Sequence, residues 1–309
     1  FFSSLTTPST RVVNALVYAC VALTGAFAVI GEEGHEEGHT RLGALASPYV
    51  ARHHPHIHDT GGEGLGLGRR PALIGIGIGV PGPISDGGIV NRCVNLGWDR
   101  VDLHTELSAL TGLKVKGGND ANVAALGECW LGGGQGASDF VMATLGTGVG
   151  GGIVIEGKLL HGAHGSGAEI GHMVLNRNET ATCGCGKYGC VEQYCSATGI
   201  VRLAGLHGMH KVTCKDIFDA AKAGDKVALE IMDEYYEYLG EFLGSLCSVI
   251  DPEVVVLGGG VSKAGDMLLT GVEPYFHKYV FHAASEVKFA LASLGNDAGA
   301  YGAFKLVAE

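Results

Sequence analysis

From residue 72 onward, apolar and polar positions alternate in a way that predicts successive strands and helices. Short apolar runs bounded by turn residues predict strands at 72–80, 114–118, 139–145, 151–160, 253–260 and 287–292. Amphipathic or glycine-terminated segments predict helices at 101–112, 122–134, 225–250 and 298–308. The segment 225–250 carries a single apolar stripe along its whole length. Strands that alternate with helices indicate an α/β fold.

Residues 1–71 do not follow this pattern. They contain the direct repeat EEGH-EEGH (32–39), and six of the 14 histidines lie between His35 and His58. The run HHPHIH (53–58) offers imidazoles to a metal ion, but no cysteine and no ordered ligand spacing accompanies it. A solvated tail is therefore the favoured interpretation, and we expect an atypical N-terminal segment.

The apolar stretch 12–30 has two interpretations. Its length allows a membrane span, and the AFA run at 26–28 resembles a signal-cleavage site. The stretch also contains Asn14 and Thr24, however, and Arg11 alone is a weak basic region. We favour buried strands or a helix of an α/β core, and expect a cytoplasmic protein that does not contact a membrane.

The composition favours a globular protein that acts on a small molecule. Hydrophobic residues make up 46% of the 309 residues and charged residues 17%, which is enough apolar material for two domains. The formal net charge of −11 disfavours nucleic acid and anionic membranes as partners. The 52 glycines lie mostly in short clusters between apolar runs, which indicates turns and ligand-facing loops.

A cysteine-rich motif predicts a metal site. Cys183, Cys185 and Cys190 form the pattern C-x-C-x4-C and follow His172. One imidazole and three thiolates satisfy tetrahedral zinc and leave no open position, so the predicted Zn²⁺ is structural. The alternative is three ordinary buried cysteines beside an unrelated histidine, but the intervening glycines favour a metal knuckle in a reducing compartment.

Glycine-rich turns predict a nucleotide site. They are LGTGVGGG (145–152), LGGGVS (257–262) and LGNDAGAYGAF (294–304), and each follows a strand or opens a helix. Backbone amides of such turns converge on anions, and Thr147 adds a hydroxyl. One turn alone is a weak signal, because glycine turns also join hairpins. Together they indicate a single nucleotide cleft.

Asp120, within GNDAN (118–122), lies where a predicted strand meets a predicted helix. The positive end of the helix dipole favours the ionised carboxylate there. An ionised carboxylate suits a base that accepts a proton during phosphoryl transfer. From spacing alone an ordinary helix N-cap would be the better interpretation, and only the neighbouring motifs favour catalysis.

Taken in order, the motifs carry a family resemblance. They are VPGP (80–83), NLGW (95–98), GNDANVAALGE (118–128), LGTGVGGG (145–152), GAEIGH (167–172), CGCGKYGCVEQY (183–194) and LGGGVS (257–262). From about residue 72 onward the sequence resembles the ROK family of sugar kinases, and within it the bacterial glucokinases. The resemblance implies a two-lobe, actin-like ATPase (ribonuclease H-like) fold with a structural zinc. Residues 72–119 and helix 298–309 would form the N-terminal lobe, and residues 120–297 the C-terminal lobe.

The resemblance also implies an activity and its residues. The chain would transfer phosphate from ATP, bound with Mg²⁺, to a hexose, most readily converting glucose to glucose 6-phosphate. Asp120 would accept the proton of the attacking hydroxyl, and His172 would bind both zinc and sugar. The implied sugar contacts are Pro81, Gly82, Asn119, Glu169, His172 and Glu192. The implied ATP contacts are Gly146, Thr147, Gly148, Gly150 and Gly151 for the phosphates, and Gly258, Gly259 and Gly260 for the adenosine. A homodimer or homotetramer is also implied.

One family element is not matched in place. ROK kinases begin with a strand leading into D-x-G-G-T, which clamps the ATP phosphates, whereas here the letters DTGGE (59–63) follow HHPHIH. We therefore expect an N-terminal lobe that is incomplete or altered. The alternatives are a kinase for N-acetylglucosamine, N-acetylmannosamine, fructose or allose, a non-catalytic sugar-binding protein, or a sugar-sensing repressor of the same family. The acidic charge and the lack of paired helices in 1–71 disfavour the repressor.

Overall fold

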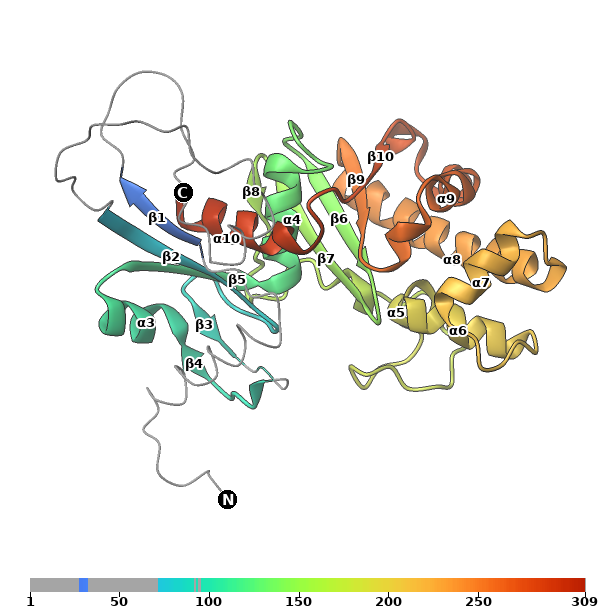
Figure 1. The fold of residues 1–309 in the computed structure, drawn as a ribbon, viewed down its shortest axis with the longest axis horizontal. Helices are drawn as coiled ribbons and strands as arrows, with labels where there is room; N and C mark the ends of the chain where they lie inside the picture. The colour runs from blue at the N-terminus through green and yellow to red at the C-terminus, as the bar shows by residue number, and fades with distance from the viewer. Residues whose placement is uncertain (1–27, 33–71, 92, 94–95, 309) are drawn as a thin grey trace, which may run out of the picture. The chain divides into compact units, whose positions relative to one another are not determined.

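The computed structural model describes residues 28–32, 72–91, 93 and 96–308. Within them the chain forms two compact α/β units, whose elements are labelled in Figure 1. Unit 1 contains the described residues up to Trp130, the segment His161–Ser166 and the residues from Asn296 onward. Unit 2 contains Leu131–Leu160 and Gly167–Gly295.

Unit 1 is built on a three-stranded sheet in the order β1-β2-β5. Its strands are β1 (Ala28–Glu32), β2 (Ala72–Val80) and β5 (Lys114–Asn119). β1 runs antiparallel to β2, whereas β2 and β5 are parallel. A second, two-stranded sheet pairs β3 (Ile89–Val90) with β4 (Val101–Asp102).

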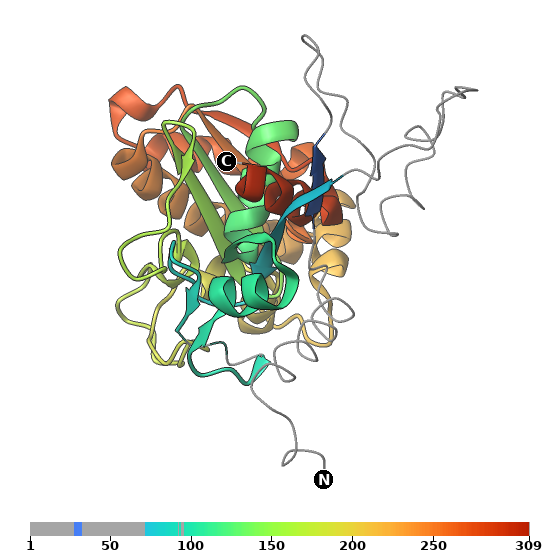
Figure 2. The same cartoon turned by 90° about the vertical axis from the view of Figure 1, so that its left-hand side faces the viewer.

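Two helices cover opposite faces of the main sheet of unit 1 (Figure 1, Figure 2). They are α3 (Leu103–Thr111) and α10 (Ala298–Ala308). A Cβ added at Gly117 would lie 3.2 Å from Leu103 of α3, and one at the next residue, Gly118, 3.5 Å from Leu306 of α10. Successive strand residues point to opposite faces, so the two helices lie on opposite sides.

Glycines in β2 bring α10 close to the sheet. A Cβ on Gly77 would lie 1.8 Å from the carbonyl oxygen of Ala303, so a larger residue there would push the helix away. On the other side, α3 begins where the Asp102 carboxylate accepts a hydrogen bond from the Thr105 amide, and it ends at Gly112 with a φ of 72°. The glycines of β2 therefore set how closely α10 approaches the sheet, and the caps of α3 set where that helix begins and ends.

Unit 2 is built on a five-stranded sheet in the order β10-β9-β6-β7-β8. Its strands are β6 (Phe140–Leu145), β7 (Val149–Ile155), β8 (Lys158–Leu159), β9 (Val254–Gly258) and β10 (Lys288–Leu291). β6, β9 and β10 are mutually parallel, and β7 is antiparallel to both β6 and β8.

The helices of unit 2 form its hydrophobic core together with strands β6, β7 and β9. They are α5 (Glu192–Cys195), α6 (Ala197–Leu206), α7 (Cys214–Lys222), α8 (Lys226–Ile250) and α9 (Asp266–Tyr279). Single 3₁₀ turns lie at Ile170–His172, Val261–Ala264 and His282–Ala284, and another at Gly295–Asp297 spans the end of unit 2. Asp225 caps the start of α8. The predicted apolar stripe is buried at Ile231, Tyr235, Leu239, Phe242 and Leu246, whereas Val227 in the first turn is exposed.

Helix α4 (Asp120–Leu131) packs on α10 through two glycines. A Cβ on Gly127 would lie 2.1 Å from the carbonyl oxygen of Ala298, and one on Gly302 only 1.6 Å from that of Val123. This close approach places α4 up to Trp130 in unit 1, whereas the sequence boundaries assigned residues 120–297 to the C-terminal lobe. His161–Ser166 also joins unit 1, where a Cβ on Gly165 would lie 2.5 Å from the Ile84 backbone.

The strands and helices predicted from residue 72 onward are present with ends that shift by a few residues, except that the predicted strand 151–160 is divided into the antiparallel strands β7 and β8. Helices α5, α6, α7 and α9 were not predicted. At the other end of the chain, Ala28–Ile30 of the apolar stretch belong to β1, while residues 12–27, HHPHIH and DTGGE lie outside the described residues. None of the described helices is both long enough and apolar enough to cross a bilayer.

Candidate active site and metal centre

Residues predicted to bind sugar gather at one edge of the unit 1 sheet. The parallel strands β2 and β5 end side by side, with Val80 opposite Asn119. The Asn119 side-chain amide donates to the carbonyl oxygen of Gly82 at 3.4 Å, and its side-chain oxygen accepts from the Ala121 amide at 3.0 Å. Ligands of α/β proteins commonly bind at the carboxyl ends of parallel strands. The structure thus brings Pro81, Gly82, Asn119 and Asp120 together.

Asp120 begins α4 and keeps its carboxylate in contact with solvent. One carboxylate oxygen accepts a hydrogen bond from the Ala121 amide at 2.9 Å. The surrounding protein nevertheless displaces enough water to raise the pKa of Asp120, and this desolvation outweighs the lowering by the Ala121 amide. The helix dipole alone predicted the opposite direction. A carboxylate that is accessible and more basic than usual suits proton acceptance.

Two of the predicted glycine-rich loops meet at one edge of the unit 2 sheet. β6 and β9 are parallel neighbours, with Thr144 opposite Gly258. Gly259 has a φ of +81°, and a Cβ there would lie 2.5 Å from the carbonyl oxygen of Leu145. The start of α6 fixes the first loop, because the Ala197 amide donates to the Gly146 carbonyl oxygen at 2.8 Å. The structure therefore places the loops 146–148 and 258–260 side by side.

Other glycines of these motifs have packing roles. Gly150 and Gly151 lie within β7 rather than in the turn, and a Cβ on Gly151 would lie 2.3 Å from the Ile170 side chain. In the third motif, Gly302 makes room for α4. Close packing thus accounts for Gly151 and Gly302 without a ligand.

The ligand atoms of His172, Cys183, Cys185 and Cys190 all lie within 4.8 Å of one another. Nδ1 of His172 is 3.9 Å from the Cys183 sulfur, and the sulfurs of Cys185 and Cys190 are 3.6 Å apart. Tetrahedral zinc with Zn–S bonds of about 2.3 Å places two sulfurs about 3.8 Å apart. The donor set and its spacing therefore fit zinc.

The backbone of the knuckle depends on glycine. The Gly186 amide donates to the Cys183 carbonyl oxygen at 2.9 Å, with φ of +85° at Gly186. Gly189 has φ of +71°, and a Cβ there would lie 1.8 Å from the carbonyl oxygen of Asn176. Burial, together with the neighbouring thiols, raises the pKa of Cys190 to about 12. A divalent cation would reverse this effect, because it stabilises thiolates.

Residues predicted to bind the sugar lie around these four candidate metal ligands, which together are called the metal cluster below. His172 is on a 3₁₀ turn, with Nδ1 toward Cys183 and Nε2 4.0 Å from a Glu169 carboxylate oxygen. Glu192 opens α5, accepts from the Val149 amide at 3.1 Å and lies 3.6 Å from the Cys183 sulfur. Glu192 therefore contacts both the glycine-rich turn and the metal cluster.

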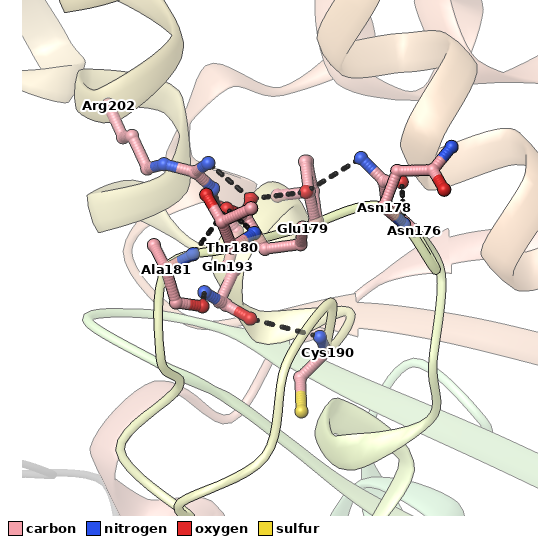
Figure 3. Close-up of polar contacts among 9 residues, drawn as sticks. Asn176, Asn178, Glu179, Thr180, Ala181, Cys190, Gln193 and Arg202 are labelled. Carbon is pink, nitrogen blue, oxygen red and sulfur yellow. Dashed lines mark hydrogen bonds and ion pairs between the residues drawn. The ribbon is translucent and has the colours of Figure 1, made fainter.

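A polar network beside the cluster was not predicted. It joins Glu179, Tyr194 and Arg202. Figure 3 shows Glu179 and Arg202 together with their neighbours. None of the three belonged to the predicted site. The sequence contained only one hint of this network, which is that the acidic residue Glu179 stands four positions before the first cysteine of the motif.

Comparisons with known proteins agree with the motifs. The ROK family profile matches residues 67–309. The chain is 45% identical over 255 residues to a glucokinase from Halalkalibacterium halodurans, covering 77% of each chain. It is 39% identical over 251 residues to a glucokinase from Thermotoga maritima, covering 76% of this chain and 79% of that protein.

The fold agrees as well. The structure resembles the crystal structure of a ROK family glucokinase from Streptomyces griseus in complex with glucose and AMPPNP. The TM-score is 0.64 at 35% identity, with coverage of 76% of this chain and 82% of that chain. The expected actin-like, two-lobe α/β fold is therefore confirmed. With a profile match over more than half of its length and relatives of this similarity, the chain belongs to the ROK family.

Proposed function

We propose that this chain is an ATP-dependent hexose kinase that converts glucose to glucose 6-phosphate. One observation carries the proposal: the VPGP turn, Asn119 and Asp120 meet at the carboxyl ends of β2 and β5, and the Asp120 carboxylate is accessible. The similarity to glucokinases supports glucose as the sugar.

Asp120 acts as the base in this proposal. Its carboxylate accepts the proton of the sugar hydroxyl while the hydroxyl oxygen forms a bond to the γ-phosphorus of ATP. The bond between that phosphorus and the bridging oxygen breaks, and ADP leaves with the electron pair. The raised pKa of Asp120 favours the proton transfer. Asn119 is already fixed by its contacts with Gly82 and Ala121, so it holds a neighbouring hydroxyl in place.

The other residues expected to bind sugar belong to unit 2. Glu169, His172 and Glu192 bind ring hydroxyls, with Nε2 of His172 available to the sugar because Nδ1 faces the thiols. His172, Cys183, Cys185 and Cys190 hold one structural Zn²⁺, which supplies a fixed charge that orients the histidine. Thiols must be reduced to bind zinc, which favours a reducing compartment such as the cytoplasm.

The glycine-rich loops bind ATP. Gly146, Thr147 and Gly148 face the phosphates, followed by Gly150 in β7, and Gly258, Gly259 and Gly260 face the adenosine. A Cβ on Gly146 or Gly260 would meet no atom within 4 Å, which leaves room for a ligand beside the backbone. Mg²⁺ arrives with ATP and is held mainly by its phosphates.

A coupled ADP-release assay tests the proposal. We expect the highest kcat/KM with glucose among glucose, N-acetylglucosamine, N-acetylmannosamine, fructose and allose. Asp120→Asn should lower kcat by about 10²–10⁴-fold while glucose affinity, measured by calorimetry, changes little. An active Asp120→Asn variant would exclude Asp120 as the base. Sugar binding without turnover would favour a non-catalytic protein, and specific operator binding a repressor.

A further inference from the structure

A nearly buried carboxylate, that of Glu179, lies near the candidate metal ligand Cys190 (Figure 3). The Glu179 side chain is only 6% exposed, and one of its oxygens pairs with the Arg202 guanidinium and accepts from the Tyr194 hydroxyl at 2.5 Å. The other oxygen accepts from the amides of Thr180 and Ala181 at 2.9 and 2.8 Å. Both carboxylate oxygens are therefore used, and we call Glu179, Tyr194 and Arg202 the Glu179 network.

Polar contacts lead from this network to a metal ligand. The Ala181 backbone, held by Glu179, accepts at its carbonyl oxygen from the Gln193 side-chain amide at 2.9 Å. The Gln193 side-chain oxygen in turn accepts from the Cys190 amide at 3.1 Å. Arg202 also donates to the carbonyl oxygen of Gln193 at 3.4 Å. Cys190 and the first turn of α5 are thereby tied to Glu179.

A second set of contacts reaches the other side of the knuckle. The Asn176 side-chain amide donates to the Tyr194 hydroxyl at 3.0 Å. The Asn176 backbone amide donates to the carbonyl oxygen of Gly189, next to Cys190, at 3.1 Å. Both segments that flank the cysteine motif therefore converge on Tyr194 and Glu179.

A contribution to folding stability does not by itself explain the Glu179–Arg202 ion pair. Desolvation of two charges often cancels their attraction, so a buried ion pair contributes less to stability than its geometry implies. Its directional contacts do restrict the position of whatever they join. Here they join Cys190, which is a metal ligand, and α5, which begins with Glu192.

We propose that Glu179 is a positioning residue that, through Arg202, Tyr194 and Gln193, holds Cys190 for metal retention and Glu192 for sugar binding. The sugar half of this proposal rests on the proposed kinase function, whereas the metal half does not. Residues that orient metal ligands typically affect metal affinity or activity by about 10–100-fold.

The test compares Glu179→Gln with a matched control. The amide keeps one acceptor for the Thr180 and Ala181 amides but turns a donor toward Arg202 and Tyr194. The control is Glu237→Gln on α8, because Glu237 makes the same kind of triad with Lys278 at 2.5 Å and Tyr279 at 2.8 Å. Glu237 lies on α8 and its two partners on α9, and neither helix carries any of the four candidate metal ligands.

Both variants are loaded with zinc and transferred to a chromophoric chelator. We expect Glu179→Gln to release zinc about 10-fold faster than the wild type and to raise the KM for glucose about 10-fold, with kcat and the KM for ATP within about 2-fold. The control should match the wild type in all four quantities. Arg202→Lys, which keeps the charge but not the planar fork, should lie between them.

Wild-type zinc release and glucose KM in Glu179→Gln would overturn the proposal, even if the variant melted at a lower temperature. A wild type that binds no zinc would overturn it as well. A wild type that phosphorylates no hexose would refute the proposed function instead, and zinc release would still decide the role of Glu179.

Discussion

The contact between Glu192 and the first glycine-rich turn can be tested with one methyl group. In a Gly148→Ala variant the new Cβ would lie 2.1 Å from a Glu192 carboxylate oxygen. Cβ atoms essentially never lie within 3.0 Å of another non-bonded heavy atom, so the oxygen must retreat by about 0.9 Å. A retreat of that size away from the turn takes its 3.1 Å bond from the Val149 amide beyond hydrogen-bonding distance.

The expected loss is large enough to measure. A hydrogen bond to a charged group contributes about 1.5–3 kcal/mol. In a unit of this size each kcal/mol corresponds to roughly 2–4 °C, so the melting temperature should fall by roughly 3–12 °C. If Glu192 binds the sugar, the same displacement should lower kcat/KM for glucose by about 10–100-fold.

Thermal unfolding and initial-rate kinetics give the two readouts. Gly146→Ala is the stability control, because a Cβ there meets no atom within 4 Å and its melting temperature should stay within about 1 °C of the wild type. A Gly148→Ala variant with wild-type melting temperature and wild-type glucose KM would show that Glu192 does not rest against the turn.

Two further predictions concern the metal centre and the first unit. Cys185→Ser removes one of four ligands, so zinc content by elemental analysis should fall and unit 2 should melt at a lower temperature; unchanged zinc would mean that the site is misassigned. His104 accepts at Nε2 from the Gly117 amide at 2.8 Å, and burial lowers its pKa below the usual value of 6.5. Its contribution to stability is therefore complete above about pH 6.5 and is lost as the pH falls through the lowered pKa. Urea unfolding between pH 7.5 and 5 should show a steeper loss of stability in the wild type than in His104→Gln, and equal slopes would contradict this role.

Local pattern was enough to predict most of the fold and much of the site. The apolar stripe of 225–250 and the apolar runs before glycine turns carry their own signal, because period and turn chemistry are local properties. Asn119 and the Cys183 motif could be identified in the same way, since strand ends and ligand spacing can be seen in the sequence. Their predicted functions await the experiments described above.

Contacts between distant residues account for what was missed. The packing of Val123 against Gly302 decides that α4 belongs to unit 1, and no local pattern relates two residues so far apart. The pairing of Glu179 with Arg202 depends in the same way on the tertiary fold. For Asp120, the helix end was predicted, but the desolvation that sets the direction of its pKa comes from surrounding protein.

The seat of α10 on β2 has a consequence for synthesis of the protein. The helix covers a sheet whose central strand leaves the ribosome about 200 residues earlier. One side of that sheet therefore lacks its covering helix until the end of translation. By the time α10 is made, all of unit 2 has already been synthesised. We therefore expect unit 2 to fold before unit 1 is complete. Until then, the uncovered face of the unit 1 sheet is the surface that a nascent-chain chaperone would protect.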